Sequence, residues 1–582
     1  MAEQQKTGQS MPGSEILIRS LMAEGVDTIF GYPGGAIMPV YDTLYDFQNQ
    51  LRHILVRHEQ GAVHAAQGYA RVSGKTGVVF VTSGPGATNA ITGIADAMMD
   101  STPLVVISGQ VGASLLGFDA FQETDVLGMT LPITKWSYQI RRPEDVAWAV
   151  ARAFFIARTG RPGPVVLDFA KNAQVGPAVF DYKPVNFIRS YVPTPDVSDE
   201  KVRQAAQILN QAKRPMVVYG QGIMLSHAEK ELADFLDKTG TPAASTLLGL
   251  SALDSKNPHY KGMVGMHGNI GPNVKTNECD VLLAIGMRFD DRVTGVVSTY
   301  ARQARIIHVD IDRAELNKII PVEVGIEGDA REVLTRLTEI VNPAKHDEWE
   351  ASFDKCNADE RNLVSRHEVA PGAGNIRMGE VVDAVSRIGN SEPVVVTDVG
   401  QNQMISARYS TFRHSRSLLT SGGLGTMGFG LPAAVGAKVA APERNVCVFC
   451  GDGGLQMTIQ ELGTIMQENL GVKIILLNNN WLGNVRQWQQ LFFGSRYSFT
   501  RLANPDFMNI AESYGIAHLK VEKREELDNA VAQMLADPAQ PFILEVHVEE
   551  QDNVFPMIPP GKGVTDIMLN ANAWYDYEPL AK

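Results

Sequence analysis

Short apolar runs alternate with helical patterns over the first third of the chain, and this alternation limits the possible folds most strongly. The runs at 26–30, 78–82 and 104–108 have the length and residue types of buried strands, and 60–72 and 87–99 have the pattern of helices. Strand–helix–strand order with glycine at the strand ends is typical of a mostly parallel sheet covered on both faces. The sequence therefore predicts an α/β fold.

The alternation returns in two later blocks of the chain. The further apolar runs of strand length are 216–219, 281–285, 306–309, 394–397, 446–449, 473–477 and 542–546. Between the blocks, 182–199 and 346–375 are polar or rich in Pro and Gly, and we predict that both are exposed linkers. The predicted fold is α/β with three doubly wound parallel-sheet domains at 1–189, 190–370 and 371–582, the last with a C-terminal tail. Length alone, 582 residues, favours roughly four domains.

The charge of the chain excludes some classes of partner. With 52 basic and 65 acidic side chains the formal net charge is -13, which does not suit a nucleic-acid or anionic-membrane partner. Residues 1–7 lack the basic start and apolar run of a signal peptide, and no stretch approaches about 18 consecutive apolar residues. We expect a cytoplasmic protein with no nucleic acid and no membrane among its partners.

The four cysteines are too few for a disulfide framework in a chain of this length. Cys447 and Cys450 form a C-x-x-C pattern, but both lie inside an apolar run. We predict that they are small core residues rather than metal ligands or a redox pair.

The most informative motif is Gly-Asp-Gly at 451–453, followed after 24 residues by Asn-Asn-Asn at 478–480. Each half follows an apolar strand, and open α/β sheets bind ligands at the carboxyl ends of their strands. The oxygens of Asp452 and Asn479, with a backbone carbonyl, would make an incomplete Mg²⁺ site that a diphosphate completes. Separately, the halves also suit a turn and a strand cap, but their combination favours the metal–diphosphate site.

This pair of motifs is similar to the signature of thiamine diphosphate enzymes, and the resemblance covers nearly the whole chain. Such enzymes have a pyrimidine-binding domain, a central domain and a diphosphate-binding domain. The resemblance implies that Asp452, Asn479 and the carbonyl of Trp481 bind Mg²⁺. It also implies further contacts with the cofactor from Pro33, Gly34, Gly400, Gln401, Gly425, Gly453 and Gly454.

Two further residues acquire roles through this resemblance. Glu59 follows the second strand of the first domain and would hydrogen-bond pyrimidine N1′, so that the N4′ nitrogen removes the thiazolium C2 proton. The alternative for Glu59 is a carboxylate at the start of the following helix. Met427 would lie between the two cofactor rings and force them into a bent shape, and otherwise it is a core residue.

Segments in all three domains look like the anabolic, FAD-containing acetohydroxyacid synthase family, also called acetolactate synthase. They are 31–35, 83–89, 119–123, 265–268, 288–295 and 485–489. The resemblance implies that pyruvate is decarboxylated and joined to pyruvate or 2-ketobutyrate, in the first common step of branched-chain amino acid biosynthesis. It implies thiamine diphosphate, Mg²⁺ and a structural FAD, a homodimer or tetramer, and a regulatory small subunit.

The same resemblance assigns the substrate site. Arg292 would hold the carboxylate of the second 2-keto acid, which suits a planar guanidinium, although a generic arginine more often forms a surface salt bridge. Trp488 would narrow the acceptor pocket in favour of 2-ketobutyrate, by roughly 1–3 kcal/mol for one methylene. Gln122, Phe121, Lys171 and Met266 would line the site across a dimer interface. The FAD residues would be Arg161, Gly220, Gly222, Thr246, Leu247, Met266, Arg288, Asp310 and Asp329.

Two positions depart from the family pattern. Asn484 stands where the family often has Met, which changes a wall of the pocket. Asn402 stands where the family has His, and an asparagine, unlike a histidine, does not titrate. Two other functions stay open at this point. One is an FAD-linked pyruvate oxidase or catabolic acetolactate synthase, and the other is a nucleotide-binding scaffold without catalysis.

Overall fold

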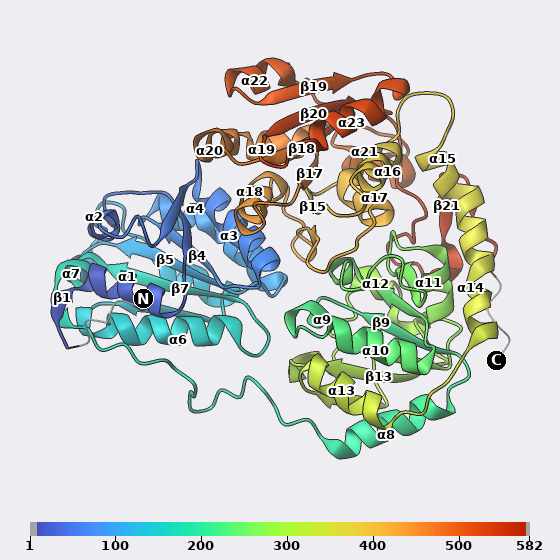
Figure 1. The fold of residues 1–582 in the computed structure, drawn as a ribbon, viewed down its shortest axis with the longest axis horizontal. Coiled ribbons are helices and arrows are strands. Elements are labelled where there is room, and N and C mark those ends of the chain that lie inside the picture. The colour runs from blue at the N-terminus through green and yellow to red at the C-terminus, as the bar shows by residue number, and fades with distance from the viewer. Residues whose placement is uncertain (1–7, 578–582) are drawn as a thin grey trace.

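The structure is a computed structural model that describes residues 8–577. Over this range the strands form three six-stranded sheets and two short two-stranded ones. Figure 1 shows the first large sheet at the left, the second at the lower right and the third at the top. Residues 1–7, on which the expectation about a signal peptide rests, lie outside the described range. Within that range, no helix is both long and apolar enough to cross a bilayer.

The first sheet is parallel throughout, in the order β3-β2-β4-β5-β7-β6. Its strands are β2 (Thr28–Gly31), β3 (Arg52–Leu55), β4 (Gly77–Val81), β5 (Leu104–Gln110), β6 (Trp136–Ile140) and β7 (Pro164–Ala170). Val79 and Val81 pack with helices α3 (Glu59–Ser73) and α4 (Pro85–Met99), whereas Val78 and Phe80 pack with α1 (Gly13–Ala23) and α6 (Val146–Arg158). Because both faces are covered, the central strands β4 and β5 are buried at every position, whereas the edge strands β3 and β6 carry polar residues.

The second and third sheets are also parallel, in the orders β11-β10-β9-β12-β13-β14 and β16-β15-β17-β18-β20-β19. The second contains β9 (Pro215–Tyr219), β10 (Ala243–Ser245), β11 (Tyr260–Met263), β12 (Val281–Ile285), β13 (Arg305–Asp310) and β14 (Val324–Glu327). The third contains β15 (Val394–Thr397), β16 (Leu418–Leu419), β17 (Val446–Gly451), β18 (Val472–Asn478), β19 (Ala517–Val521) and β20 (Phe542–His547). Every strand that the sequence predicts coincides with one of these strands, and the predicted helices 60–72 and 87–99 coincide with α3 and α4.

The first of the two predicted linkers is confirmed and the second is wrong. Residues 182–198 hold no helix, and one isolated bridge joins Ile188 and Tyr191 before α8 (Asp199–Gln211) begins. In contrast, 346–375 contains the long helix α14 (Asp347–Glu360), which continues through a π turn into α15 (Arg366–Val369). Trp349, Phe353 and Cys356 share one face of α14 and are buried against the second domain. Many charged residues around them hide this narrow apolar face in the sequence.

The cysteines are core residues, as the sequence predicts. All four are free and buried, and Cys447 and Cys450 are fully buried on β17.

Helix α3 of the first domain packs directly on α18 (Gly430–Ala440) of the third. A Cβ atom on Gly68 would lie 2.0 Å from the carbonyl oxygen of Ala433, and one on Gly436 would lie 1.7 Å from that of Ala65. Only glycine permits this close approach of the two backbones. Apolar residues of both domains therefore form one continuous core.

Candidate functional site

The metal motif lies at the carboxyl edge of the third sheet. Asp452 begins α19 (Asp452–Met457) directly after β17, and the register of β17 with β18 brings Gly451 beside Leu477. The Nδ2 atom of Asn504 donates to Asp452 Oδ2 at 2.6 Å, and at 3.1 Å and 3.2 Å to the side-chain oxygens of Asn478 and Asn480. One amide therefore ties together the two loops that the sequence motif predicts to meet.

The side chain of Asp452 has the properties of a carboxylate that binds a cation. Its side chain is fully buried, its Oδ1 atom has no hydrogen-bond partner, and burial raises its pKa to about 6. A buried carboxylate oxygen without a donor is costly unless a cation or proton neutralises it. Asn479 and Trp481 follow β18 at the same edge, where Asn479 Oδ1 accepts from the Trp481 N–H at 3.1 Å, and carboxylate, amide and carbonyl oxygens of this kind would suit Mg²⁺. Clusters of three or more His, Cys, Asp or Glu are absent from residues 8–577, which leaves this mixed oxygen set as the candidate metal centre.

The segment 400–402 lies beside this centre. Gln401 Oε1 accepts a 3.4 Å hydrogen bond from Asn479 Nδ2, and a Cβ atom on Gly483 would lie 2.2 Å from the same oxygen. Asn402 is buried and donates from Nδ2 to the carbonyl of Phe449 at 3.0 Å. Asn402, which stands where the family has His, is therefore anchored to the end of β17 and helps fix the edge.

Met427 lies close to the metal loop, as its proposed place between the cofactor rings requires. Its Cε atom is 3.8 Å from the position of a Cβ atom on Gly453. The backbone after Met427 is held by Asp398, a residue that the sequence reasoning missed. Its carboxylate accepts from the N–H groups of Gly428 at 3.0 Å and Gly430 at 2.9 Å, and it is 1% exposed.

Two more buried carboxylates hold the earlier part of the same segment, Asp96 on α4 of the first domain and Asp100 directly after its end. Asp96 accepts hydrogen bonds from the hydroxyls of Ser421 and Thr426. Asp100 accepts from the N–H groups of Gly422 at 2.9 Å and Gly423 at 2.7 Å. Two acidic residues four positions apart, in and directly after a largely apolar helix, are an unusual pattern that could have been recognised in the sequence.

Asp100 is also paired with a cation. Arg71 Nη2 lies 2.8 Å from Asp100 Oδ2, and both side chains are largely buried. Burial raises the pKa of the Asp100 carboxyl, while Arg71 and the two N–H donors oppose this change. The segment 421–430 is therefore clamped from both domains at once.

Glu59 lies at the equivalent edge of the first sheet. It is the first residue of α3, it is 9% exposed, and its Oε2 atom accepts from Asn89 Nδ2 at 3.0 Å. Its Oε1 atom is 3.3 Å from a Cβ position on Gly86, so a larger residue at position 86 would crowd the carboxylate. Glu59 is therefore a buried carboxylate next to a position that needs a small residue.

Other predicted residues gather around Glu59. Gly34 and Gly86 both face Thr82, and a Cβ atom on Gly84 would lie 2.9 Å from the carbonyl of Gln122. Lys171 Nζ is 3.5 Å from the carbonyl of Gly35. Pro33 precedes Gly34 in the same segment. Asp452 and its partners lie on the third sheet, whereas Glu59 and the residues around it lie on the first.

The remaining predicted residues line a second feature, a cavity of about 750 Å³ with walls from all three domains. Its lining includes Arg161, Gly222, Thr246, Leu247, Met266, Arg288, Arg292, Asp310, Asp329, Gly425, Asn484 and Trp488. Gly220, which is not part of the lining, lies just behind it, because its Cβ position is 2.3 Å from the carbonyl of Gly286. The volume is that of a site for a large organic ligand.

One end of this cavity is formed at the carboxyl ends of strands of the second sheet. Gly222 lies against Gly286 at the carboxyl ends of β9 and β12, with 2.5 Å between its Cβ position and Gly286 Cα. Asp310 ends β13, and burial raises its pKa to about 7. Asp329 caps α13 (Ala330–Ile340) by accepting from two of its N–H groups. Ligands of open α/β sheets bind at such strand ends, so these residues fit FAD. Arg161 is now paired with Glu315 at 2.7 Å.

Arg292 and Trp488 lie at the other end of the cavity. Arg292 is on the short helix α12 (Asp291–Thr294), is 58% exposed, and its only carboxylate contact in the described chain is Asp291 at 3.8 Å. Its Nη1 atom is 3.8 Å from Met266 Sδ. Trp488 is on α21 (Gly483–Phe492), together with Asn484. A guanidinium with a weak partner beside an aromatic wall can bind a small carboxylate with an apolar end.

Three profiles of known families match the chain in order. They are the thiamine pyrophosphate enzyme N-terminal TPP binding domain over 11–129, the central domain over 202–337 and the C-terminal TPP binding domain over 398–546. Each match lies on one of the three large sheets. The length-based estimate of four domains is therefore one too high.

Whole proteins of known activity are also similar to this chain. It is 45% identical over 560 residues to the acetolactate synthase isozyme 2 large subunit of Escherichia coli (strain K12), covering 96% of this chain and 99% of that protein. The acetolactate synthase large subunit of Corynebacterium glutamicum is 43% identical, with 98% and 93% covered. That of Lactococcus lactis subsp. lactis is 42% identical, with 94% of each covered.

Proposed function

The chain belongs to the acetolactate synthase family of thiamine pyrophosphate enzymes, and from this we propose how its residues divide the reaction. It decarboxylates pyruvate and joins the two-carbon unit to a second 2-keto acid. Pyruvate as acceptor gives 2-acetolactate, and 2-ketobutyrate gives 2-aceto-2-hydroxybutyrate, the precursors of the branched-chain amino acids. The structural observation that carries the proposal is the buried, unpartnered Oδ1 atom of Asp452 beside Asn479.

Asp452, Asn479 and the Trp481 carbonyl would hold Mg²⁺, which binds the diphosphate of the cofactor. Thiamine pyrophosphate supplies an electron sink for the loss of CO₂. Gly400, Gln401, Gly425, Gly453 and Gly454 would contact the cofactor, and Met427 would set the angle between its rings. Asp398 supports this role because it holds the backbone after Met427.

The remaining groups bind substrate or move protons. Glu59 would exchange a proton with the pyrimidine ring, and its buried carboxylate at the sheet edge, next to Gly86, supports this role. Arg292 would hold the carboxylate of the acceptor, and Trp488 would limit the size of its side chain. Asn484 lies in the wall between them.

We propose that the complete site forms between two copies of the chain, each giving the Glu59 edge to the metal edge of the other. Phe118 and Phe121 next to the Glu59 edge are 76% and 89% exposed, which is unusual for a free surface of a monomer. Gln122 and Lys171 would reach the substrate across this interface. A tetramer and a regulatory small subunit are further proposals that follow from the family.

The proposed domain limits are 1–189 for pyrimidine binding, 190–370 for FAD and 371–582 for the diphosphate. FAD would occupy the 750 Å³ cavity without taking part in electron transfer, because the reaction has no net oxidation.

One experiment tests the function. Purified enzyme is given pyruvate with and without thiamine pyrophosphate, Mg²⁺ and FAD, and acetolactate, acetate and peroxide are measured together. We expect acetolactate as the main product, dependent on thiamine pyrophosphate and Mg²⁺. Acetate with peroxide as the main products would instead identify a pyruvate oxidase, and turnover without added or bound cofactor would refute the assignment of the metal edge.

A further inference from the structure

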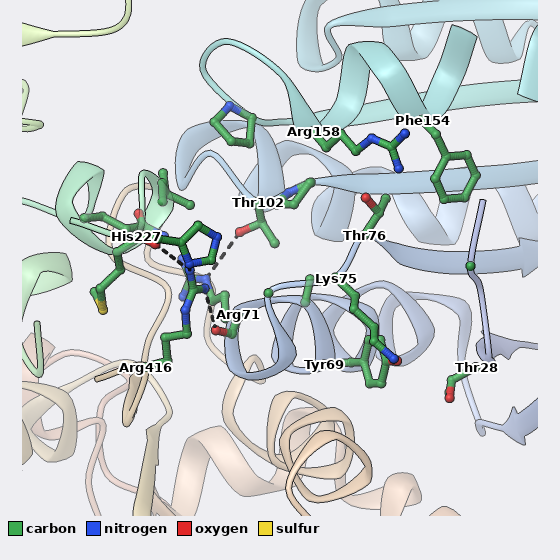
Figure 2. A pocket seen from close by; sticks show the side chains of 18 of the residues that line it. Thr28, Tyr69, Arg71, Lys75, Thr76, Thr102, Phe154, Arg158, His227 and Arg416 are labelled. Atoms are coloured by element: carbon green, nitrogen blue, oxygen red, sulfur yellow. Dashed lines mark hydrogen bonds between the residues drawn. The ribbon is translucent and has the colours of Figure 1, made fainter. Parts of the chain in front are cut away.

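A second, smaller cavity lies where the three domains meet, and no step of the proposed reaction uses it. We call it the junction pocket; its volume is about 290 Å³. The first domain contributes the start of β2, the end of α3 and part of α6, and the other two domains contribute α9 (Gly222–Leu225) and the segment before β16. Figure 2 shows Arg416 and His227 together at one side of this pocket, near Arg71.

Two residues with positive φ angles other than glycine meet at this place, beside a glycine helix cap. Gly74, His227 and Arg416 have φ angles of 73°, 53° and 56°, and each comes from a different domain. A Cβ atom on Gly74 would lie 3.8 Å from both Arg416 Cζ and His227 Cε1. Gly74 is an ordinary left-handed helix cap, but an arginine at positive φ is uncommon and costs about 1–3 kcal/mol. Such strain is found mostly at sites with a function.

The charge of Arg416 is not balanced within the described chain. Its guanidinium donates to the carbonyls of Arg71, at 3.3 Å, and Met224, and it meets His227 Nδ1 at 3.4 Å. No carboxylate of residues 8–577 forms a salt bridge with it; burial lowers its pKa, and the charge of Glu229 opposes this change without outweighing it. A half-buried charge without a directly paired counter-ion is expensive, and an anion in the pocket would reduce this cost.

The other cations of the pocket differ from Arg416 in this respect. Arg71 is paired with Asp100, Arg158 with Glu24 at 2.9 Å, and Lys75 with Asp27. The wall also contains apolar side chains, namely Phe154, Met224, Leu225, Leu248 and Leu418. The pocket thus offers one free positive charge beside an apolar surface.

We propose that the junction pocket binds a small oxyanion, the carboxylate or phosphate group of a metabolite, through Arg416 and His227. Lys75 lines the same pocket and is exposed. The bound group would connect all three domains at one point. Gln221, Leu225 and Leu248 also line the 750 Å³ cavity, so an occupant of the junction pocket shares walls with the proposed FAD site.

The test uses the holoenzyme saturated with thiamine pyrophosphate, Mg²⁺ and FAD, so that added anions do not stabilise it through the cofactor sites. Tm is measured against increasing inorganic phosphate or isobutyrate, with NaCl at equal ionic strength as reference. A ligand that binds only the folded protein raises Tm with concentration. We expect a saturable rise with at least one of the two anions, and the anion with the lower midpoint identifies the group that the pocket prefers.

Three variants connect the rise to the pocket. Arg416→Met removes the charge and keeps the apolar stem, and we expect the rise to disappear. His227→Asn tolerates positive φ and should shift the midpoint at least several-fold, which keeps the test valid if Arg416→Met does not fold. Arg413→Met, on the exposed side of the same segment, should behave as wild type. An absent rise in wild type, or an equal rise in His227→Asn and any folded Arg416→Met, would overturn the proposal.

Discussion

Replacing Asp398 with Asn tests whether its carboxylate, which binds the backbone after Met427, fixes the geometry of the proposed cofactor site. In the structure Oδ1 accepts from the N–H groups of Val399 at 2.8 Å and Gly428 at 3.0 Å. Oδ2 accepts from Gly428 at 3.0 Å and Gly430 at 2.9 Å. An amide has only one accepting oxygen, so one orientation leaves the Val399 donor facing an NH₂ group and the other leaves the Gly430 donor in that position.

Either orientation therefore leaves at least one buried backbone N–H group without an acceptor. Such a donor costs about 1–3 kcal/mol. Because the segment is also held by Asp96 and Asp100, we expect it to remain folded but to shift away from the geometry that binds the cofactor. If the whole cost appears in binding, the affinity for thiamine pyrophosphate falls about 5- to 150-fold.

The assay is acetolactate formation at increasing thiamine pyrophosphate with saturating Mg²⁺ and pyruvate. In Asp398→Asn the half-activating concentration should rise by that factor, with a smaller fall in kcat. Asp383→Asn on α16 (Met378–Ile388) is the matched control, because its side chain is 48% exposed and should leave both values unchanged. A half-activating concentration equal to that of wild type in Asp398→Asn would refute the reasoning.

Four further predictions follow from the site and its surroundings. Glu59→Gln should lower acetolactate formation at least 100-fold while Mg²⁺ and thiamine pyrophosphate still bind, measured by turnover and by calorimetric titration. Trp488→Leu should lower the preference for 2-ketobutyrate over pyruvate about tenfold, measured as the product ratio when both compete. Chelation of Mg²⁺ should abolish activity reversibly, because the Asp452 oxygen then has no cation, and added Mg²⁺ should restore it. Asp168 is buried with one unpartnered oxygen, and burial raises its pKa to about 7. Since this pKa is above that of the unfolded chain, the protonated form stabilises the fold, and this stability is lost as pH rises from about 4 to 7. Asp168→Asn, which keeps the acceptor for Gln110 and Gln139, should raise the free energy of unfolding at pH 8 by up to about 4 kcal/mol and have little effect at pH 4.

Each of these has an outcome that would contradict it. Turnover near that of wild type in Glu59→Gln removes the carboxylate from the mechanism, and an unchanged product ratio removes Trp488 from the acceptor pocket. Full activity after chelation, with metal loss verified by elemental analysis, contradicts the metal site. An equal effect of Asp168→Asn at pH 4 and pH 8 means that packing, not ionisation, decides its stability.

The central strands could be predicted from the sequence because they are buried on two faces, whereas partly exposed strands such as β3 and β19 were not predicted. The runs at 281–285 and 394–397 match β12 and β15 at both ends. Asp452 and Asn479 could be identified because each directly follows such a strand. Local patterns were sufficient in these cases, since the residues that decide the structure are adjacent in the chain.

The missed features depend on contacts between distant segments. Asp96 touches Ser421 across more than three hundred residues, and Asp398 touches Gly428 across thirty. A single sequence does not reveal such pairs; it shows only that a charged residue stands on an otherwise apolar helix face. Helix α14 was missed for a related reason, because its three buried residues cover a narrow stripe that composition alone does not reveal.

The core shared by α3 and α18 has a consequence for synthesis of the protein. Helix α3 ends at Ser73, but α18, which covers it, begins at Gly430. At the usual pace of about 5–20 residues per second, roughly 20–70 s separate the two on the ribosome. During that interval the nascent first domain displays an apolar helix face that its own residues cannot cover. We therefore expect the emerging chain to recruit chaperones in this window, and fragments that stop before residue 430 to aggregate.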